Sequence, residues 1–194
     1  MSIELIKQEI EASINVKNKL LLDVELMNQI LDTAKKCVES LRNGGKIIFC
    51  GNGGSFADAQ HLSAEFTSRF MFNRPALASI ALGTNSSSMS AIGNDYGYED
   101  VFSREIEALG SDKDILIAIS TSGNSANVIK AIGAAEKLNI PVYILTGKTG
   151  GKIHSFKGCI KIPSENTARI QECHILIGHI ICGFVEKQMF GNEY

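Results

Sequence analysis

The sequence contains no tryptophan, only three prolines and no excess of basic residues. Lysine and arginine together number 19 against 21 aspartates and glutamates, a net charge of −2. A surface that binds a nucleic-acid duplex normally carries a basic excess, so we expect no nucleic-acid partner. Tandem repeats and low-complexity tracts are also missing, which leaves no candidate linker. We therefore expect a single domain over residues 1–194.

Long apolar runs and cysteine pairs are equally missing. The most apolar stretch, residues 175–185, contains His179 and is shorter than the roughly 18 residues that a membrane-spanning helix needs. The five cysteines form no CxxC pair, and such an odd, unpaired set is typical of buried thiols in a reducing compartment. The first residues lack the basic-then-apolar pattern of a signal peptide. These features predict a soluble cytoplasmic protein without a membrane partner.

The order of apolar patterns along the chain predicts the fold class. Isoleucines 3, 6, 10 and 14 recur at helical spacing, and a second such stretch ends before Gly44-Gly45, which predicts an N-terminal pair of helices over about residues 2–43. Short β-rich runs then alternate with helical segments. The runs cover residues 46–50, 78–82, 114–119, 142–145 and 159–162. We expect an α/β domain in three layers, with about five parallel strands and helices on both faces.

The last predicted helix, over about residues 167–189, is apolar around much of its circumference. A helix of this kind must be buried on most of its sides. Because the chain is short, packing against another subunit would provide that burial. The pattern therefore predicts a homo-oligomer.

Three of the predicted strands end in small, glycine- or hydroxyl-rich segments. They read GNGGS at residues 51–55, STSGNS at 120–125 and TGKTGG at 146–151. In open parallel sheets ligands bind beyond the carboxyl ends of the strands, and free N–H groups at a helix start favour an anion. Two such junctions in one chain indicate a phosphate site. Serine, threonine and glycine also cap helices and form turns, so any one of these loops, taken alone, also fits a purely structural role.

Nucleotide-binding motifs do not account for these loops. The first loop is not a GxGxxG motif followed by a ribose-binding acid, and the sequence contains no GxxxxGK[ST]. The sequence therefore favours a phosphorylated small molecule over a nucleotide.

Several residues could carry acid–base chemistry. His61 and Glu65 are four residues apart on a predicted helix, and Gln171, His174 and His179 lie on the last helix. Such a His/Glu pair is often a surface contact, and histidines on an apolar helix are often buried structural residues. Ketose–aldose isomerisation would give them a common purpose, with Glu65 as the base and His179 as its partner.

The same residues offer a mixed set of metal ligands. The imidazoles of His61 and His179, the carboxylate of Glu65 and the amide of Gln171 supply nitrogen and oxygen donors, compatible with zinc though not diagnostic of it. A divalent cation would polarise the carbonyl of a sugar.

At this point the motifs resemble a known family. GNGGS at residues 51–55, DAQH at 58–61, Glu65, Asn94-Asp95, STSGNS at 120–125 and RIQE at 169–172 are similar to those of the phosphoheptose isomerases, a group of the SIS (sugar isomerase) domain proteins. The similarity extends over nearly the whole chain. It implies conversion of sedoheptulose 7-phosphate to D-glycero-D-manno-heptose 7-phosphate, for bacterial surface-heptose synthesis.

The resemblance also implies roles for individual residues and a homotetramer with one zinc ion per subunit. Glu65 and His179 would transfer protons, and the metal ligands would be His61, Glu65, Gln171 and His179. Substrate contacts would come from Asn52, Gly53, Gly54, Ser55, Glu65, Asn94, Asp95, Ser120, Thr121, Ser122, Ser125 and Gln171.

Helix geometry predicts active sites shared between subunits. At about 1.5 Å per residue, Glu65 lies about 15 Å along its helix from Ser55, and Gln171 about 12 Å from His179. An extended heptose phosphate spans roughly 10 Å from phosphorus to its carbonyl end. Within one chain, Glu65 is therefore too far from the phosphate end for this substrate, and Gln171 and His179 are too far apart to bind one metal. Groups from two chains would remove both difficulties.

Two alternatives remain. A non-catalytic SIS protein, which binds a sugar phosphate or the replication initiator for regulation, would keep the serine loops without needing an acid or a base, and the presence of Glu65 and His179 favours an enzyme. An isomerase of a hexose or pentose phosphate would share the same motifs.

Overall fold

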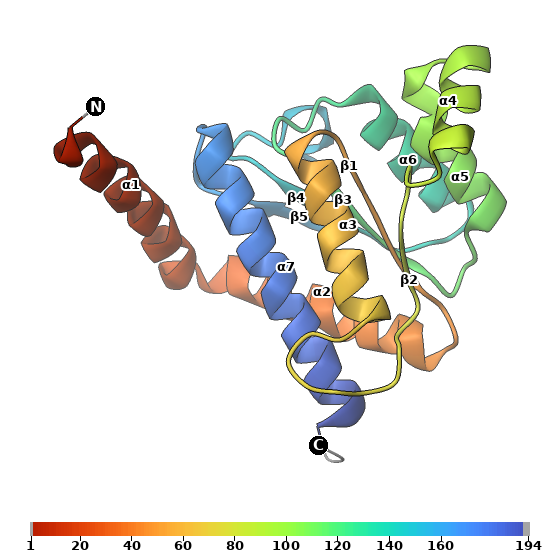
Figure 1. Cartoon of the computed structure of the whole chain (residues 1–194), viewed down its shortest axis with the longest axis horizontal. Helices are drawn as coiled ribbons and strands as arrows, with labels where there is room; N and C mark the ends of the chain where they lie inside the picture. The colour runs from red at the N-terminus through yellow and green to blue at the C-terminus, as the bar shows by residue number, and fades with distance from the viewer. Residues whose placement is uncertain (1, 192–194) are drawn as a thin grey trace.

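Five parallel strands form one sheet at the centre of the computed structural model, which describes residues 2–191 (Figure 1). The spatial order of the strands is β2-β1-β3-β4-β5. They are β1 (Ile47–Gly51), β2 (Ser79–Ala81), β3 (Ile115–Ser120), β4 (Val142–Thr146) and β5 (Cys159–Lys161). Every predicted strand is confirmed, with each boundary within one residue. Residues 1 and 194, the limits of the predicted domain, lie outside the described residues.

The two central strands are buried along their whole length. β1 (IIFCG) and β3 (ILIAIS) pair in register, with Ile47 opposite Ile115 and Gly51 opposite Ile119. Both are continuous apolar runs, as expected where helices cover both faces of a parallel sheet.

Seven α-helices and two short 3-10 turns connect and flank the strands within the described residues. The helices are α1 (Ile3–Leu22), α2 (Val24–Arg42), α3 (Gly54–Thr67), α4 (Ser86–Asp95), α5 (Val101–Leu109), α6 (Ala126–Lys137) and α7 (Thr167–Phe190). The N-terminal pair and the last helix are confirmed. None of the helices in residues 2–191 is long and apolar enough to cross a membrane.

The side chains of the sheet alternate between two hydrophobic cores, as the pleat of a strand requires. Phe49 packs with Phe66 of α3 and with α2 and α7 on one face. Ile48 packs with Phe102 of α5 and with α6 on the other face. The predicted three-layer α/β architecture is therefore confirmed.

Helix α1 stands apart from the sheet (Figure 1) and packs against α7 and α2 through Val16 and Leu20. The isoleucines predicted to mark this helix are largely exposed, at 74% for Ile3, 52% for Ile6, 55% for Ile10 and 50% for Ile14. Within residues 2–191 the helix therefore carries an exposed apolar stripe.

The sheet topology opens a crevice at the carboxyl ends of β1 and β3. From β1 the chain passes through α3 to β2 on one side, whereas from β3 it passes through α6 to β4 on the other. The α3 helix covers one face of the sheet and α6 covers the opposite face. Adjacent loops that diverge in this way form the usual ligand-binding position of open α/β sheets.

Candidate active site

Both helices that begin at this crevice have uncapped amino ends. Gly53 precedes α3 and Ser125 precedes α6, and neither residue gives a side-chain cap hydrogen bond. The side chains of Asp23, Asn85 and Asn166 cap α2, α4 and α7, whereas α1 and α5 also lack a side-chain cap. An uncapped helix start directs free N–H groups and the positive end of the helix dipole outward, which suits an anion.

The hydroxyl-rich loop after β3 is folded into a closed turn. The Oγ atoms of Ser120 and Ser125 lie 3.2 Å apart, and the Gly123 N–H donates to Ser120 Oγ at 3.2 Å. Gly123 has a φ of +65°, and a Cβ on it would stand 2.0 Å from the Gly150 carbonyl oxygen. Only glycine fits this left-handed, crowded position.

The third glycine-rich segment, residues 146–151, is hydrogen-bonded to the hydroxyl-rich loop. The Gly147 N–H donates to the Thr121 carbonyl, and the Lys152 N–H donates to the carbonyl of Gly123 and to Asn124 Oδ1. The segment at 146–151 therefore supports the hydroxyl loop.

The first loop is joined to α6 by a pair of amide side chains. Asn52 Nδ2 donates to Asn127 Oδ1 at 2.8 Å, and Asn127 Nδ2 donates to Asn52 Oδ1 at 2.9 Å. The hydroxyl of Tyr98, which follows α4, donates to the same Asn52 oxygen at 3.1 Å. Three segments of the chain thus meet at Asn52.

Further along α3 the structure brings His61, Glu65 and His179 together. His61 Nε2 lies 3.1 Å from Glu65 Oε1 and 3.0 Å from His179 Nε2. One ligand atom from each of the three residues lies within 4.8 Å of the others, and no other such cluster of histidine, cysteine and acidic residues occurs in residues 2–191. The sequence identified all three residues, and they meet from two helices.

Close packing of α3 on α7 creates this cluster. A Cβ on Gly178 would stand 2.5 Å from the Leu62 side chain, so the two helices approach closely beside His61 and His179. The ring of Phe70 stacks on His179, with ring centroids 5.4 Å apart. Phe70 thereby limits how the imidazole can turn.

The turn that follows α3 is anchored by a buried ion pair. The side chains of Arg74 and Glu186 are each 1% exposed, and Arg74 Nε lies 3.0 Å from Glu186 Oε1. Glu186 also accepts the backbone N–H groups of Phe70 and Met71. Arg74 Nη2 donates to the Glu65 carbonyl at 2.7 Å, which ties this network to the helix end that carries the candidate base.

Gln171 lies apart from the histidine cluster within this chain. Its amide packs against Gly54, where a Cβ would stand 2.5 Å from Gln171 Nε2. His179 is two turns further along α7 and meets His61 instead. Asn94 and Asp95, also predicted to contact substrate, lie exposed at the end of α4 and are hydrogen-bonded to each other at 2.8 Å.

Two further titratable groups lie near these elements. Burial raises the pKa of Asp58, which stands one turn before His61, although the charges of His61 and His179 oppose the shift. One Asp58 oxygen is buried and has no hydrogen-bond partner among the described residues. Burial lowers the pKa of His174 to about 4, and its Nε2 lies 3.3 Å from the Thr146 carbonyl oxygen. His174 is therefore a neutral structural residue.

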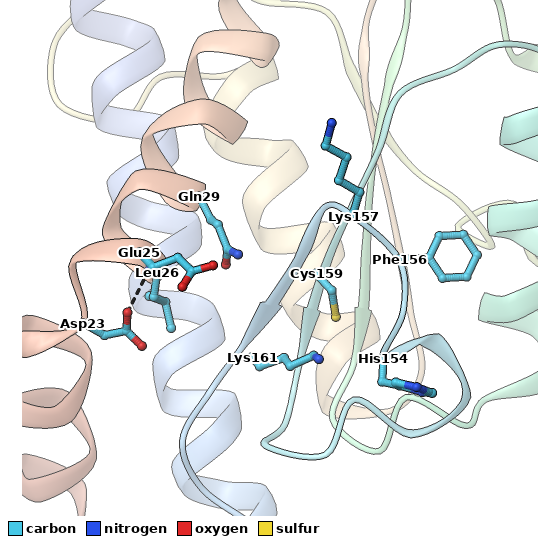
Figure 2. Close-up of a pocket in the computed structure, with 9 residues that line it drawn as sticks. All are labelled: Asp23, Glu25, Leu26, Gln29, His154, Phe156, Lys157, Cys159 and Lys161. Carbon is cyan, nitrogen blue, oxygen red and sulfur yellow. Dashed lines mark hydrogen bonds between the residues drawn. The ribbon is translucent and has the colours of Figure 1, made fainter.

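A separate groove lies beside β5, away from the crevice (Figure 2). Its volume is ≈ 280 Å³, and it has acidic side chains from the start of α2 and lysines beside β5. In Figure 2 these side chains do not converge on a common point, and the groove contains none of the predicted site residues. We assign it no function.

Comparison with known proteins identifies the family. A family model described as the SIS domain matches residues 14–147. The chain is 53% identical to a phosphoheptose isomerase from Aneurinibacillus thermoaerophilus, over 97% of this chain and 96% of the relative. The chain belongs to the SIS domain family, among the phosphoheptose isomerases.

Solved structures of phosphoheptose isomerases have the same fold. The structure from Neisseria gonorrhoeae is 44% identical with a TM-score of 0.86, and the alignment covers 95% of this chain and 98% of that one. The structure from Francisella tularensis is 36% identical with a TM-score of 0.90, and the alignment covers 96% of this chain and 99% of that one. The resemblance inferred from the motifs is confirmed.

Proposed function

We propose that this SIS domain enzyme interconverts sedoheptulose 7-phosphate and D-glycero-D-manno-heptose 7-phosphate, which supplies bacterial surface-heptose synthesis. The observation that carries this proposal is the cluster formed by His61 and Glu65 of α3, the helix that begins at the crevice, with His179 of α7. Identity of 53% to a phosphoheptose isomerase supports the reaction and the substrate.

The reaction needs a base and a proton shuttle. Glu65 removes the proton from C1 of the ketose, which leaves an enediolate, and returns a proton to C2 to give the aldose. His179 transfers the hydroxyl proton between the two oxygens, so that no proton is gained or lost overall. Contact of both side chains with His61 supports this assignment.

The phosphate group binds at the crevice between β1 and β3. The residues for this role are Asn52, Gly53, Gly54, Ser55, Ser120, Thr121, Ser122 and Ser125. The uncapped starts of α3 and α6 and the clustered hydroxyls support it. Asn94, Asp95 and Gln171 would contact the rest of the sugar.

A divalent metal ion, zinc in our proposal, fits the donor set of His61, Glu65 and His179, because their ligand atoms lie within 4.8 Å of one another. Gln171, which lies apart from this cluster within one chain, would complete the set from a neighbouring subunit. When bound, the metal polarises the substrate carbonyl and stabilises negative charge on the oxygens. Elemental analysis of protein purified without a histidine tag, before and after chelation, measures this directly. A fully active metal-free protein contradicts the assignment.

The enzyme acts as a homotetramer in this proposal. The exposed isoleucines of α1 support self-association, and so does an apolar groove between α2 and α7. The groove is lined by Met27, Ile30, Leu31, Ala34, Ile180 and Phe184. Contiguous apolar side chains on a protein surface often mark an interface. We also place the enzyme in the cytoplasm, as supported by five buried cysteines without a disulfide.

An assay against a panel of sugar phosphates tests the function. We expect turnover of sedoheptulose 7-phosphate, with weaker or no turnover of ketohexose and ketopentose phosphates. Faster turnover of a hexose or pentose phosphate overturns the substrate assignment. Binding without turnover of any member overturns the assignment as an isomerase.

A further inference from the structure

The orientation of the Asn52 amide is fixed by a chain of hydrogen bonds that begins at a backbone group. The Val128 N–H can only donate, and it donates to Asn127 Oδ1 at 3.0 Å. Asn127 therefore presents its oxygen to Asn52 Nδ2 and its nitrogen to Asn52 Oδ1. The opposite orientation of either amide would place two donors or two acceptors against each other.

The Asn52 side chain keeps one hydrogen-bonding group that a ligand can use. Its carbonyl oxygen has two lone pairs, which accept from Asn127 Nδ2 and the Tyr98 hydroxyl. Its Nδ2 group has two N–H bonds, one of which is used by Asn127 Oδ1. One N–H of Asn52 remains. Held in this way, Asn52 can offer a ligand a hydrogen-bond donor but no acceptor.

The residues that hold Asn52 come from three separate parts of the fold. Asn127 lies in the first turn of α6 and is only 3% exposed, and Tyr98 lies in the 3-10 turn between α4 and α5. Together with Asn52 and Ser125 they line an open cavity of ≈ 570 Å³ beside the crevice. The amide pair thus joins the loop after β1 to the helix after β3 across the proposed phosphate site.

We infer that Asn127 and Tyr98 are positioning residues, which hold the Asn52 side chain as an N–H donor to an oxygen of the sugar phosphate. This inference rests on the proposed function of the same site. A fixed donor matches the phosphate and sugar oxygens that accept hydrogen bonds. Because Asn52 is held before the ligand arrives, binding does not have to order its side chain.

A double-mutant cycle tests this role, with the dissociation constant of sedoheptulose 7-phosphate measured by calorimetry. Asn52→Ala removes the donor and Asn127→Ala removes its support, so each should weaken binding, Asn52→Ala by about tenfold or more. The double variant should bind no more weakly than Asn52→Ala alone, because Asn127 acts only through Asn52. Effects that multiply in the double variant overturn the inference.

Two further variants test the same role if Asn127→Ala does not fold. Asn127→Ser keeps a small acceptor at the helix start and loses the amide pair, so it should weaken binding while a cooperative melting curve shows that the protein is still folded. Tyr98→Phe removes one hydroxyl and frees one lone pair of Asn52, and binding should weaken a few-fold. Unchanged affinity in both variants overturns the inference.

Tyr96→Phe is the matched control for Tyr98→Phe. Tyr96 is exposed, and its ring lies against the Arg104 guanidinium at 3.9 Å from the ring centroid. We expect unchanged affinity in this variant, and an equal loss in both tyrosine variants overturns the role of Tyr98. Failure of the unmodified protein to bind the sugar phosphate contradicts the proposed function instead, which separates the two conclusions.

Discussion

Arg74 Nε donates to Glu186 Oε1 at 3.0 Å, and both side chains are 1% exposed. Glu186→Ala leaves the Arg74 charge buried and removes the acceptor of two backbone N–H groups. Loss of one partner of a buried ion pair costs about 3–5 kcal/mol. For a chain of this size we expect the melting temperature to fall by roughly 6–20 °C. Thermal and urea unfolding measure this loss.

The exposed pair of Lys36 and Glu39 is the matched control. Their charged atoms are 2.6 Å apart, but the side chains are 43% and 62% exposed. Surface pairs of this kind contribute little, so Glu39→Ala should leave the melting temperature unchanged. Equal losses in Glu186→Ala and Glu39→Ala contradict the role of the buried network.

The network around Glu186 also shows where the sequence stops being predictive. Apolar runs predict strands because burial on both faces of a sheet needs apolar side chains at every position. Arg74 and Glu186 are 112 residues apart, and no local pattern links them. Their contact depends on how the turn after α3 packs on α7, which only the folded chain determines.

In the candidate site, too, local sequence patterns predict some residues and not others. His61 and Glu65 are paired by helical spacing, and the need for a second proton-transfer group selects His179 from another helix. Asn127 was missed because a single asparagine two residues after a serine loop carries no distinctive pattern. Its position at the start of a helix after a ligand-binding loop is the signal that could have identified it.

The hydroxyls of Ser120 and Ser122 should carry much of the phosphate affinity. Each hydrogen bond to a charged group contributes about 1.5–3 kcal/mol, so Ser120→Ala with Ser122→Ala should weaken binding of sugar phosphates by a few kcal/mol. Calorimetry measures the loss. Ser111→Ala, in the exposed turn at the opposite end of β3, is the control. Unchanged affinity in the folded double variant removes these serines from the phosphate site.

Replacement of Glu65 should abolish proton abstraction. Glu65→Gln keeps the size and polarity of the side chain but cannot accept the proton, so turnover should fall by about 100-fold or more. Exchange of substrate hydrogen with deuterated water reports this step. Metal content must be measured in the same preparation, because loss of a ligand also lowers the rate. Exchange at the rate of the unmodified enzyme would assign the base to another residue.

Buried His174 should make stability depend on pH. Burial lowers its pKa to about 4, below the 6.5 of an exposed histidine. Between these values the unfolded chain binds a proton that the folded chain does not, so the contribution is complete above pH 6.5 and is lost as the pH falls toward 4. The loss reaches about 3 kcal/mol. Urea unfolding at several pH values should show a smaller decrease for His174→Leu. Parallel curves for the two proteins contradict this account.

Positions within one chain argue for active sites built from two subunits. Gly54 lies beside Gln171, and His61 lies beside His179. The two contacts are therefore separated by about 10 Å along the helices, and Glu65 is one turn further on. In a single chain, Gln171 lies near the phosphate loops and away from the other proposed metal ligands. A neighbouring subunit could bring its own Gln171 or its phosphate loops to the histidine cluster.

Complementation tests whether sites are shared. A Ser120→Ala/Ser122→Ala protein lacks two hydroxyls of the phosphate loop, and a Glu65→Gln protein lacks the base, so each alone should have little activity at low substrate concentration. If one chain supplies the loop and its neighbour supplies the base, subunit exchange creates some sites that contain both intact groups. Mixing the two proteins under exchange conditions should therefore restore part of the activity. Mass spectrometry must verify that hybrids form. Because a site made by one chain always keeps its own defect, verified hybrids without activity would show that each site belongs to a single subunit.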